Sequence, residues 1–492
     1  MILSFDQGTT STRAILFNSD GTALATHAMP HQQIYPQPGW VSHNPGEIYQ
    51  NTLAVGRQAL EKAGVRAQDV QAIGITNQRE TLVAWDKDTG AAVCDAIVWQ
   101  CRRSAEICQK IKADDFETTL RAKTGLLADP YFTATKIRWV LDNVPDAQAL
   151  LRKGKLRVGT IDSYLLWRMT GGRCHVTDST NASRTMLFNI HTLGWDTEIL
   201  EYFGIPEEIL PRVVRSSGIA GETDSSELGA AIPIAGIAGD QHAALFGQCC
   251  FQEGDVKNTY GTGCFLLKNT GSKPVLSAGN LLTTLAWHIG DQPVYALEGS
   301  IFNAGSAIEW LLNEMKLVKD LEEFNQICRD TPDTGGMVFV PAFSGLGAPH
   351  WDMYARGAAL GMSLSTGKNQ FVRAAAESVA YQTVDVLNYM EQESGLSMER
   401  LRVDGGISRS DVLMQFQADM LGLPVERPAN VETTALGAAY LAGLATGVWK
   451  DLGEIAAHRQ IAKVYTPELS KNQRDEKHGR WLRAVEKAKS WA

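Results

Sequence analysis

A glycine turn rich in hydroxyl groups follows a strand-like segment near the beginning of the chain, in the stretch SFDQGTTSTRAILF, residues 4–17. Gly8 allows a tight turn, so that backbone N–H groups and side-chain donors can converge on phosphate oxygens. These donors are Thr9, Thr10, Ser11 and Arg13. Asp6, at the end of the first segment, could orient a hydrated Mg²⁺. A polar hairpin without a ligand would use the same residues, because threonine is common in strands, so both interpretations stand.

A second glycine turn, Gly261-Thr262-Gly263, interrupts a similar strand-like segment, NTYGTGCFLL, in the second half of the chain. A glycine hairpin is again the alternative. Two such turns could hold a triphosphate between them, which one turn alone could not. The chain contains no G-x-x-x-x-G-K-[ST] loop and no strand-flanked G-x-G-x-x-G that would bind a nucleotide otherwise. The pair of turns therefore favours a phosphate site.

Asp240, in GDQHAAL, stands between an apolar strand-like run and the beginning of a helix-like segment. A carboxylate there could accept a proton from a substrate hydroxyl group, or hold that group for in-line attack on phosphorus. Aspartate is also a frequent helix N-cap at such a junction, and the sequence leaves base and cap equally open. Neighbouring His242 is expected to be packed or solvent-facing, and not catalytic.

The adjacent pair Arg79-Glu80 follows the strand-like QAIGITNQ and offers both donors and an acceptor to a polyhydroxylated ligand. A solvated ion pair on a loop is the alternative. Tyr131 could add a hydroxyl group, and Trp99 and Phe265 could add an apolar wall, although core packing is the commoner use of such aromatic residues. With Asp240 these residues outline a candidate acceptor site.

The candidate residues all lie at the ends of short strand-like segments that alternate with longer helix-like ones, as in α/β proteins. Residues 1–6 and 13–17 are predicted to form a hairpin, which the turn at 18–22 continues into a three-stranded meander. Further strands are predicted at 71–77, 232–239 and 401–403. The recurrence of a glycine hairpin predicts two similar halves that face each other across a cleft, with a boundary after residue 248.

A helix is predicted to follow the Asp404-Gly405-Gly406 turn, because Ser408 and Asp411 have the spacing of a capping box ahead of an apolar-periodic segment. This places the turn at the N-terminus of that helix.

The composition is that of an ordinary globular protein of 492 residues, 44% of them hydrophobic and 21% charged. With 46 basic and 55 acidic residues, the net charge of −9 disfavours a broad surface for nucleic acid. No apolar stretch reaches the roughly 18 residues of a membrane span, and the first residues lack the pattern of a secretory signal, so a cytoplasmic location is expected. The eight cysteines form no CxxC pair, which predicts free thiols.

Taken together, these segments closely resemble the FGGY carbohydrate kinase family of the actin-like ATPase superfamily, over nearly the whole chain. The most specific segments are DQGTTSTRA (6–14), IYPQPGWVSHNP (34–45), GITNQRET (74–81), IVWQCRR (97–103), TDSTNASRTMLFNIHT (177–192), GIAGDQHAALFGQ (236–248), NTYGTGCF (258–265), FSGLGAPHWD (343–352) and RVDGG (402–406). The resemblance implies an α/β fold of two ribonuclease-H-like domains of the actin and hexokinase type, with mixed sheets flanked by helices and an interdomain cleft. Residues 1–248 would bind polyol and phosphate, and residues 249–492 the nucleotide.

The resemblance also implies the reaction, a Mg²⁺-dependent transfer of the γ-phosphoryl group of ATP to glycerol that gives sn-glycerol 3-phosphate and ADP and begins glycerol catabolism. The positions that match the acceptor site are Arg79, Glu80, Tyr131, Asp240, Gln241, Trp99 and Phe265, with Asp240 as the catalytic base. The positions that match the nucleotide site are Thr9, Thr10, Ser11, Arg13, Thr262, Gly305, Glu309, Gly406 and Ser410. The Mg²⁺-associated carboxylates are matched by Asp6 and Asp240. A homodimer or homotetramer is expected, since both are common in the family.

Two departures from the family pattern stand out. Glu309 and Ser410 occupy positions where members that act on glycerol usually carry Gln and Asn, and a carboxylate can accept a hydrogen bond from the adenine amino group but cannot donate one. The segment 225–233, SSELGAAIP, lacks the Gly-Gly-Thr-Arg loop that is associated with fructose 1,6-bisphosphate inhibition in some members. The histidine that a phosphocarrier protein modifies in others is also lacking, so neither form of regulation is expected.

Two other interpretations remain open at this point. A kinase for another sugar or polyol, such as xylulose or erythritol, would keep the chemistry and change the acceptor, although the set of Arg79, Glu80 and Tyr131 favours glycerol. A nucleotide-gated binding or assembly protein, like actin or the chaperone ATPases, would have no small acceptor and would leave those three residues without a purpose.

Overall fold

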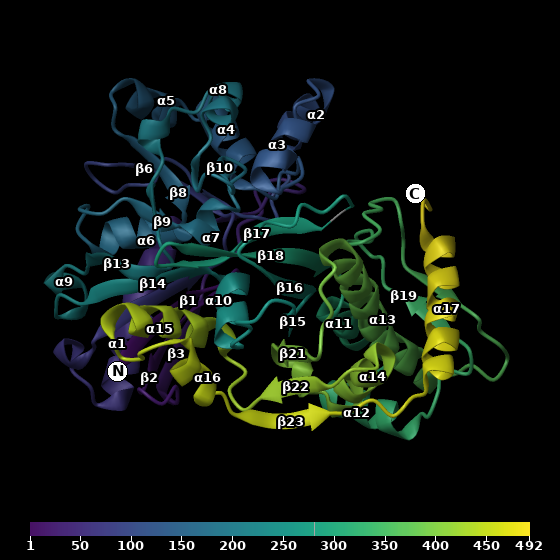
Figure 1. Ribbon diagram of the computed structural model, residues 1–492. Helices are drawn as coiled ribbons and strands as arrows, with labels where there is room; N and C mark the ends of the chain where they lie inside the picture. Colours follow the sequence, from purple (N-terminus) through teal and green to yellow (C-terminus); the bar gives the residue numbers. More distant parts are fainter. Residues whose placement is uncertain (280) are drawn as a thin grey trace.

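Two units with the same strand order form the framework of the molecule (Figure 1), which a computed structural model describes for residues 1–279 and 281–492. The first unit has the order β3 (Ala23–Pro30), β2 (Ser11–Phe17), β1 (Ile2–Gln7), β5 (Ala72–Asn77) and β14 (Pro233–Gly239). The second has the order β18 (Gln292–Ile301), β16 (Cys264–Gly271), β15 (Val256–Tyr260), β21 (Leu401–Asp404) and β22 (Val425–Pro428). In both units the first three strands are antiparallel and the last two continue in parallel.

One continuous 13-stranded sheet contains both units. It is completed by β13 (Ser217–Glu222) beside β14, β17 (Leu282–Ile289) beside β18, and β23 (Ile461–Tyr465) at the edge beside β22. The units meet where β13 and β17 pair at Ser217 and Ile289. The strands outside this sheet are β4 (Ser42–His43), β6 (Leu82–Asp86), β7 (Ala96–Ile97), β8 (Leu156–Thr160), β9 (Val176–Asp178), β10 (Phe188–Asn189), β11 (Gly194–Trp195), β12 (Arg212–Val214), β19 (Val338–Val340) and β20 (Ala358–Leu360). The predicted pair of ribonuclease-H-like units with mixed sheets is confirmed.

Helices flank this sheet in both halves of the chain (Figure 1). Those of the first half are α1 (Pro45–Ala63), α2 (Ala105–Ala113), α3 (Glu117–Thr124), α4 (Thr133–Asn143), α5 (Pro145–Arg152), α6 (Ile161–Met169), α7 (Ser179–Ala182), α8 (Thr197–Phe203), α9 (Ser225–Leu228) and α10 (Asp240–Gly247). Those of the second are α11 (Gly305–Asn313), α12 (Leu321–Asp330), α13 (Lys368–Ser394), α14 (Asp411–Leu421), α15 (Thr433–Thr446), α16 (Leu452–Ala457) and α17 (Lys471–Ala488). Short 3₁₀ turns lie at Ala67–Asp69, Glu207–Ile209 and Gly406–Arg409. No helix of the described residues is long and apolar enough to cross a membrane.

The two halves are joined most closely where α15, from the second half, packs on α10 and on the first-half strands β1, β5 and β14. A Cβ atom on Gly437 would lie 1.8 Å from the carbonyl oxygen of Ala243, and one on Gly247 would lie 2.0 Å from that of Thr433. Both glycines are therefore required for the helices to cross with their backbones in contact.

Most of the predicted elements are confirmed by the structure. β1, β2 and β3 form the three-stranded meander, and β5, β14 and β21 lie where strands are predicted. All eight cysteines are free thiols. The boundary after residue 248 stays a prediction.

The structure decides one alternative that the sequence left open and shows one predicted helix cap to be wrong. The N-cap of α10 is Gly239, so Asp240 is the first helical residue and its carboxylate is available for another role. The N-cap of α14 is Ser410, whose hydroxyl accepts from the N–H group of Leu413, whereas Ser408 lies in a 3₁₀ turn and bonds to the carbonyl of Gly405. The extra 3₁₀ turn after the glycines moves the helix start two residues further along the chain.

Candidate active site

The first glycine turn joins β1 to β2. It is closed by a hydrogen bond from the N–H group of Gly8 to the carbonyl of Ser11 (3.0 Å). The hydroxyl of Thr9 accepts a hydrogen bond from the indole N–H of Trp99 (3.0 Å), so Trp99 supports this turn, a contact that the sequence did not suggest. Thr10 is exposed. The turn therefore presents side-chain hydroxyl groups on a backbone that is already closed.

Two charged residues flank the first turn. The guanidinium of Arg13 forms an ion pair with Glu432, which sequence reasoning did not select. Burial raises the pKa of Asp6 to about 6; the positive charge of Arg13 opposes this shift, and the negative charges of Asp240 and Glu432 add to it. Asp6 lies near the carboxyl end of β1 and Asp240 follows the carboxyl end of β14, and both strands pair in parallel with β5, so the two predicted metal-associated carboxylates lie in one region.

The second glycine turn joins β15 to β16 and supports the beginning of α11. The N–H group of Gly261 donates to the carbonyl of Gly263 (2.9 Å), and those of Gly305 and Ser306 donate to the carbonyls of Gly261 (3.1 Å) and Thr262 (3.0 Å). A Cβ atom on Gly305 would lie 2.5 Å from the carbonyl oxygen of Gly261. Gly305 thus lets α11 approach the turn, while the side chain of Thr262 is exposed.

The glycines that follow β21 have different surroundings. Gly405 has a φ of 83°, and a Cβ atom there would lie 2.4 Å from the carbonyl oxygen of Tyr260. At Gly406 a Cβ atom would meet nothing within 4 Å. Gly405 is therefore needed for the fold itself, because a side chain there would collide with β15. Gly406 borders open space.

The two positions that depart from the family pattern also differ from each other. Glu309 is exposed on α11, on the surface of the second half. The hydroxyl of Ser410 donates to the side-chain oxygen of Asn325 (2.5 Å), besides capping α14. The hydroxyl of Ser410 is thus occupied, and the carboxylate of Glu309 is accessible.

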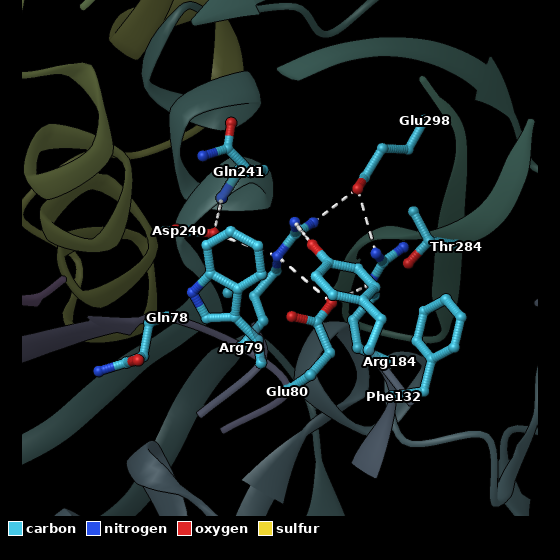
Figure 2. A network of polar contacts seen from close by, with 12 residues as sticks. Gln78, Arg79, Glu80, Phe132, Arg184, Asp240, Gln241, Thr284 and Glu298 are labelled. Carbon is cyan, nitrogen blue, oxygen red and sulfur yellow. Dashed lines mark hydrogen bonds and ion pairs between the residues drawn. The ribbon is translucent and has the colours of Figure 1, made fainter. Parts of the chain in front are cut away.

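Arg79 is the centre of the candidate acceptor site (Figure 2). Its Nε lies 3.2 Å from Oδ1 of Asp240 and 3.6 Å from Oε1 of Glu80, and its Nη2 donates to the hydroxyl of Tyr131 (2.8 Å). Arg79 is almost entirely buried and has a φ of 54°, in the left-handed region that a non-glycine residue rarely adopts. A strained backbone of this kind persists, often at functional sites, where contacts with neighbouring residues hold the residue in place. The side chain of Arg79 makes such contacts. The structure thus brings four of the predicted acceptor residues together.

Two further charged residues complete this cluster and were missed by sequence reasoning. Glu298, on β18, lies 2.5 Å from Nη1 of Arg79 and 3.1 Å from Nη2 of Arg184, and Arg184 in turn donates to Glu80 (2.7 Å). Both Arg184 and Glu298 are fully buried. The signal for Glu298 was a single acidic residue inside the apolar strand VYALEGSI, since a charge at a buried strand position needs a partner.

Asp240 differs from the other carboxylates of the cluster in being accessible. Its side chain is 26% exposed, whereas those of Glu80 and Glu298 are 1% and 0% exposed. Its Oδ1 accepts from the N–H group of Gln241 (2.7 Å). Burial raises the pKa of Asp240 above its ordinary value, against the opposing charge of Arg79. The carboxylate is therefore both reachable and more basic than an ordinary aspartate.

Partly exposed aromatic rings surround Arg79. The rings of Trp99 and Tyr131 meet edge to face with their centres 5.5 Å apart, and the guanidinium of Arg79 lies 5.8 Å from the centre of the Phe265 ring. Such rings can contact the carbon atoms of a small polyol while the charged groups bind its hydroxyl groups.

Gln241 points away from this cluster in Figure 2. Its side-chain oxygen accepts a hydrogen bond from the ammonium group of Lys257 (2.6 Å), a buried residue of β15 that sequence reasoning also missed. Burial lowers the pKa of Lys257 to about 8. Because a lysine can only donate, the amide NH₂ of Gln241 is the group that remains for another partner.

Comparison with known proteins relates this whole arrangement to one family. Residues 1–247 match the N-terminal domain, and residues 256–446 the C-terminal domain, of the FGGY family of carbohydrate kinases. The chain belongs to the FGGY family of carbohydrate kinases. It is 55% identical to a glycerol kinase of Symbiobacterium thermophilum and 53% identical to glycerol kinase 2 of Thermotoga maritima, in each case over 100% of this chain and 99% of the relative.

Solved structures of kinases agree with this assignment. The crystal structure of Plasmodium falciparum glycerol kinase with ADP is 36% identical, superimposes with a TM-score of 0.93, and covers 99% of this chain and 98% of its own. A gluconate kinase of Lactobacillus acidophilus has a TM-score of 0.88 at 23% identity, over 99% of this chain and 96% of its own, which indicates the same fold. The predicted FGGY fold is thereby confirmed.

Proposed function

We propose that this protein is a glycerol kinase, which transfers the γ-phosphoryl group of ATP to a terminal hydroxyl group of glycerol and yields sn-glycerol 3-phosphate and ADP, the first step of glycerol catabolism. The observation that carries this proposal is the accessible carboxylate of Asp240 beside the buried Arg79 cluster. The identity of 53–55% to glycerol kinases over the full chain supports the choice of acceptor.

In this proposal Asp240 accepts the proton of the attacking hydroxyl group. Burial raises its pKa, which strengthens it as a base, and the nearby guanidinium of Arg79 opposes this rise by favouring the ionised form. Arg79, Glu80 and Tyr131 bind the hydroxyl groups of glycerol, and the NH₂ group of Gln241 adds a donor. Trp99 and Phe265 pack on the carbon side. Fixed positions of these groups lower the entropic cost of bringing hydroxyl and phosphorus together.

The two glycine turns bind the nucleotide in this proposal. The hydroxyl groups of Thr9, Thr10, Ser11 and Thr262, together with Arg13, contact the phosphates. The adenosine lies toward Gly305, Glu309, Gly406 and Ser410, where Gly406 has open space around it. Closure of the two halves would exclude water that could otherwise hydrolyse ATP beside an ionised carboxylate.

Mg²⁺ fits the donor set of the same region. In residues 1–279 and 281–492 no group of three His, Cys, Asp or Glu side chains could hold a metal by itself. Mg²⁺ is commonly bound through one or two carboxylates together with substrate phosphates, which matches Asp6 and Asp240. When bound, the ion neutralises charge on the phosphates during transfer.

Glycerol-dependent formation of ADP tests nucleotide, acceptor and reaction together. The purified protein should form ADP with MgATP only when glycerol is present, and a panel with xylulose and erythritol should show a preference for glycerol. ADP formation that is indifferent to every polyol would contradict the proposal and favour a nucleotide-gated assembly protein.

A further inference from the structure

Glu298 connects the two halves of the molecule at the acceptor site. Its carboxylate belongs to β18 of the second half, whereas both of its partners, Arg79 at 2.5 Å and Arg184 at 3.1 Å, belong to the first (Figure 2). All three side chains are buried. A buried carboxylate depends on such partners for its stability, and they depend on it.

The orientation of Arg79 depends on this contact. The guanidinium is a rigid planar fork, so fixing one terminal nitrogen restricts the directions of all its other N–H groups. Glu298 contacts Nη1 of Arg79 and thereby restricts the plane of the guanidinium group. In this plane Nη2 donates to Tyr131 (2.8 Å) and Nε lies near Asp240 (3.2 Å). The contact with Glu298 therefore affects how Arg79 is oriented toward both Tyr131 and Asp240.

Arg184 links Glu298 to the neighbouring acid, Glu80, by contacting both. Its Nε donates to Glu80 (2.7 Å) and its Nη2 to Glu298, while its Nη1 is buried without a partner among the described residues. Glu80 and Glu298 are thus the acids that neutralise Arg184. Glu298 acts on Arg79 directly and on Glu80 through Arg184.

We propose that Glu298 is a positioning residue for polyol recognition, which acts from the second half by holding the Arg79 fork in the orientation that meets Tyr131 and Asp240. This inference rests on the proposed function, because glycerol is the ligand whose binding it predicts. Glu298 makes no contact with substrate in this role; it is effective only through the two arginines.

Two variants of Glu298 test the inference, and glycerol binding to the intact protein is measured by calorimetry. Glu298→Gln keeps the shape but removes the charge, and it places an amide NH₂ group against one of the arginines. Glu298→Asp keeps the charge that the arginines need for folding, but it withdraws the carboxylate by one methylene group. We expect the Kd for glycerol to rise about tenfold or more in Glu298→Gln and by a smaller factor in Glu298→Asp, with the KM for ATP within about twofold of the unchanged protein.

Glu426 provides a matched control. It is also a buried strand carboxylate held by arginines, Arg400 (2.8 Å) and Arg459 (2.8 Å), with Arg402 at 4.0 Å, but all of these residues belong to the second half and lie outside the Arg79 cluster. Glu426→Gln should lower the melting temperature and leave the Kd for glycerol unchanged, because a structural role alone does not affect recognition.

The outcomes separate this inference from the proposed function. If the unchanged protein forms no glycerol-dependent ADP, the proposed function fails. If it does, and folded Glu298→Asp binds glycerol as tightly as the unchanged protein, the positioning role is overturned. Equal loss of glycerol binding in Glu426→Gln would overturn it as well, since the effect would then be one of general stability.

Discussion

In each half of the molecule the last parallel strand of the five-stranded unit leads into a helix, and a carboxylate stands at the junction. Asp240 follows β14 directly and begins α10, whereas Glu432 follows β22 after a short connection and precedes α15. Each contacts an arginine of the first half, Arg79 and Arg13 respectively. The same topology therefore places an acid at equivalent points, but one lies beside the proposed acceptor and the other beside the proposed phosphates.

The surroundings of the two acids separate their roles. The Arg79 side chain is 3% exposed and the Arg13 side chain is 30% exposed. Electrostatic interactions are strong where water is excluded and weak where it is not. The buried guanidinium of Arg79 can tune the pKa of the catalytic base proposed beside it, whereas the more exposed ion pair of Arg13 with Glu432 can be exchanged readily for a contact with phosphate.

The two glycine turns differ in the same way. The first offers hydroxyl groups and two charged residues on a closed backbone, and the second is a backbone platform held by the N–H groups of α11. In the proposed function the first turn would therefore supply most of the side-chain contacts to phosphate, while the second turn is fixed chiefly by backbone hydrogen bonds.

The largest expected effect comes from the acid of the first half. Asp240→Asn should reduce kcat at least about a hundredfold, because removal of a well-placed base costs about 10² to 10⁴ in rate. The affinity for ATP should survive, as measured by nucleotide binding to the variant. Turnover near that of the unchanged protein would refute the division of roles between Asp240 and Glu432.

The backbone platform is tested by Gly305→Ala. The new Cβ atom would lie 2.5 Å from the carbonyl oxygen of Gly261, so we expect a loss of about 1–3 kcal/mol in the free energy of unfolding, together with a higher KM for ATP. Gly8→Ala is the matched change in the first turn, where the nearest atom would lie 3.4 Å away. Chemical denaturation of both variants should show a clearly smaller loss for Gly8→Ala; equal losses would contradict the contrast.

The pH dependence of stability follows from the carboxylate of the first turn. Because burial raises the folded-state pKa of Asp6 to about 6, against an ordinary value of 3.8, protonation favours the folded state. The associated stability is present below pH 4 and is lost as the pH rises through 6. Asp6→Asn should therefore be more stable than the unchanged protein by about 3 kcal/mol at pH 7.5 without Mg²⁺, and should lose that advantage near pH 4. Denaturation at both pH values measures this difference; an advantage that does not depend on pH would contradict it.

The smallest expected effect comes from the acid of the second half. Glu432→Gln releases Arg13 from a partly exposed ion pair, which is worth about 0–1 kcal/mol. The KM for ATP should fall by no more than about fivefold, and the KM for glycerol should not change. Steady-state kinetics with each substrate varied in turn would detect a larger or opposite effect, and that result would mean that the two acids share one role.

Features that depend on neighbouring residues in the sequence could be predicted, whereas contacts between strands that are distant in the sequence were missed. The hairpin of β1 and β2 and the position of Asp240 between a strand and a helix could be foreseen, because turn residues and apolar runs are recognised within a few positions of the sequence. The partners of Glu298 and Lys257 could not be foreseen, even though Glu298 interrupts an apolar strand, since these partners are brought close only when β18 and β15 come to lie beside the first-half residues. The cap of α14 was misplaced by two residues because both Ser408 and Ser410 have capping side chains.

The contact of α15 with the first half also has a consequence for the order in which the protein can fold during synthesis. Residues 433–446 cover β1, β5 and β14, so one face of the first-half sheet lacks its covering helix until more than four hundred residues have been made. A fragment of residues 1–248 would expose the apolar side chains of Ile2, Ile15 and Phe17, which are buried in the same cluster as Leu436 and Tyr440. The amino-terminal half thus completes its folding only when the carboxyl-terminal part of the chain arrives.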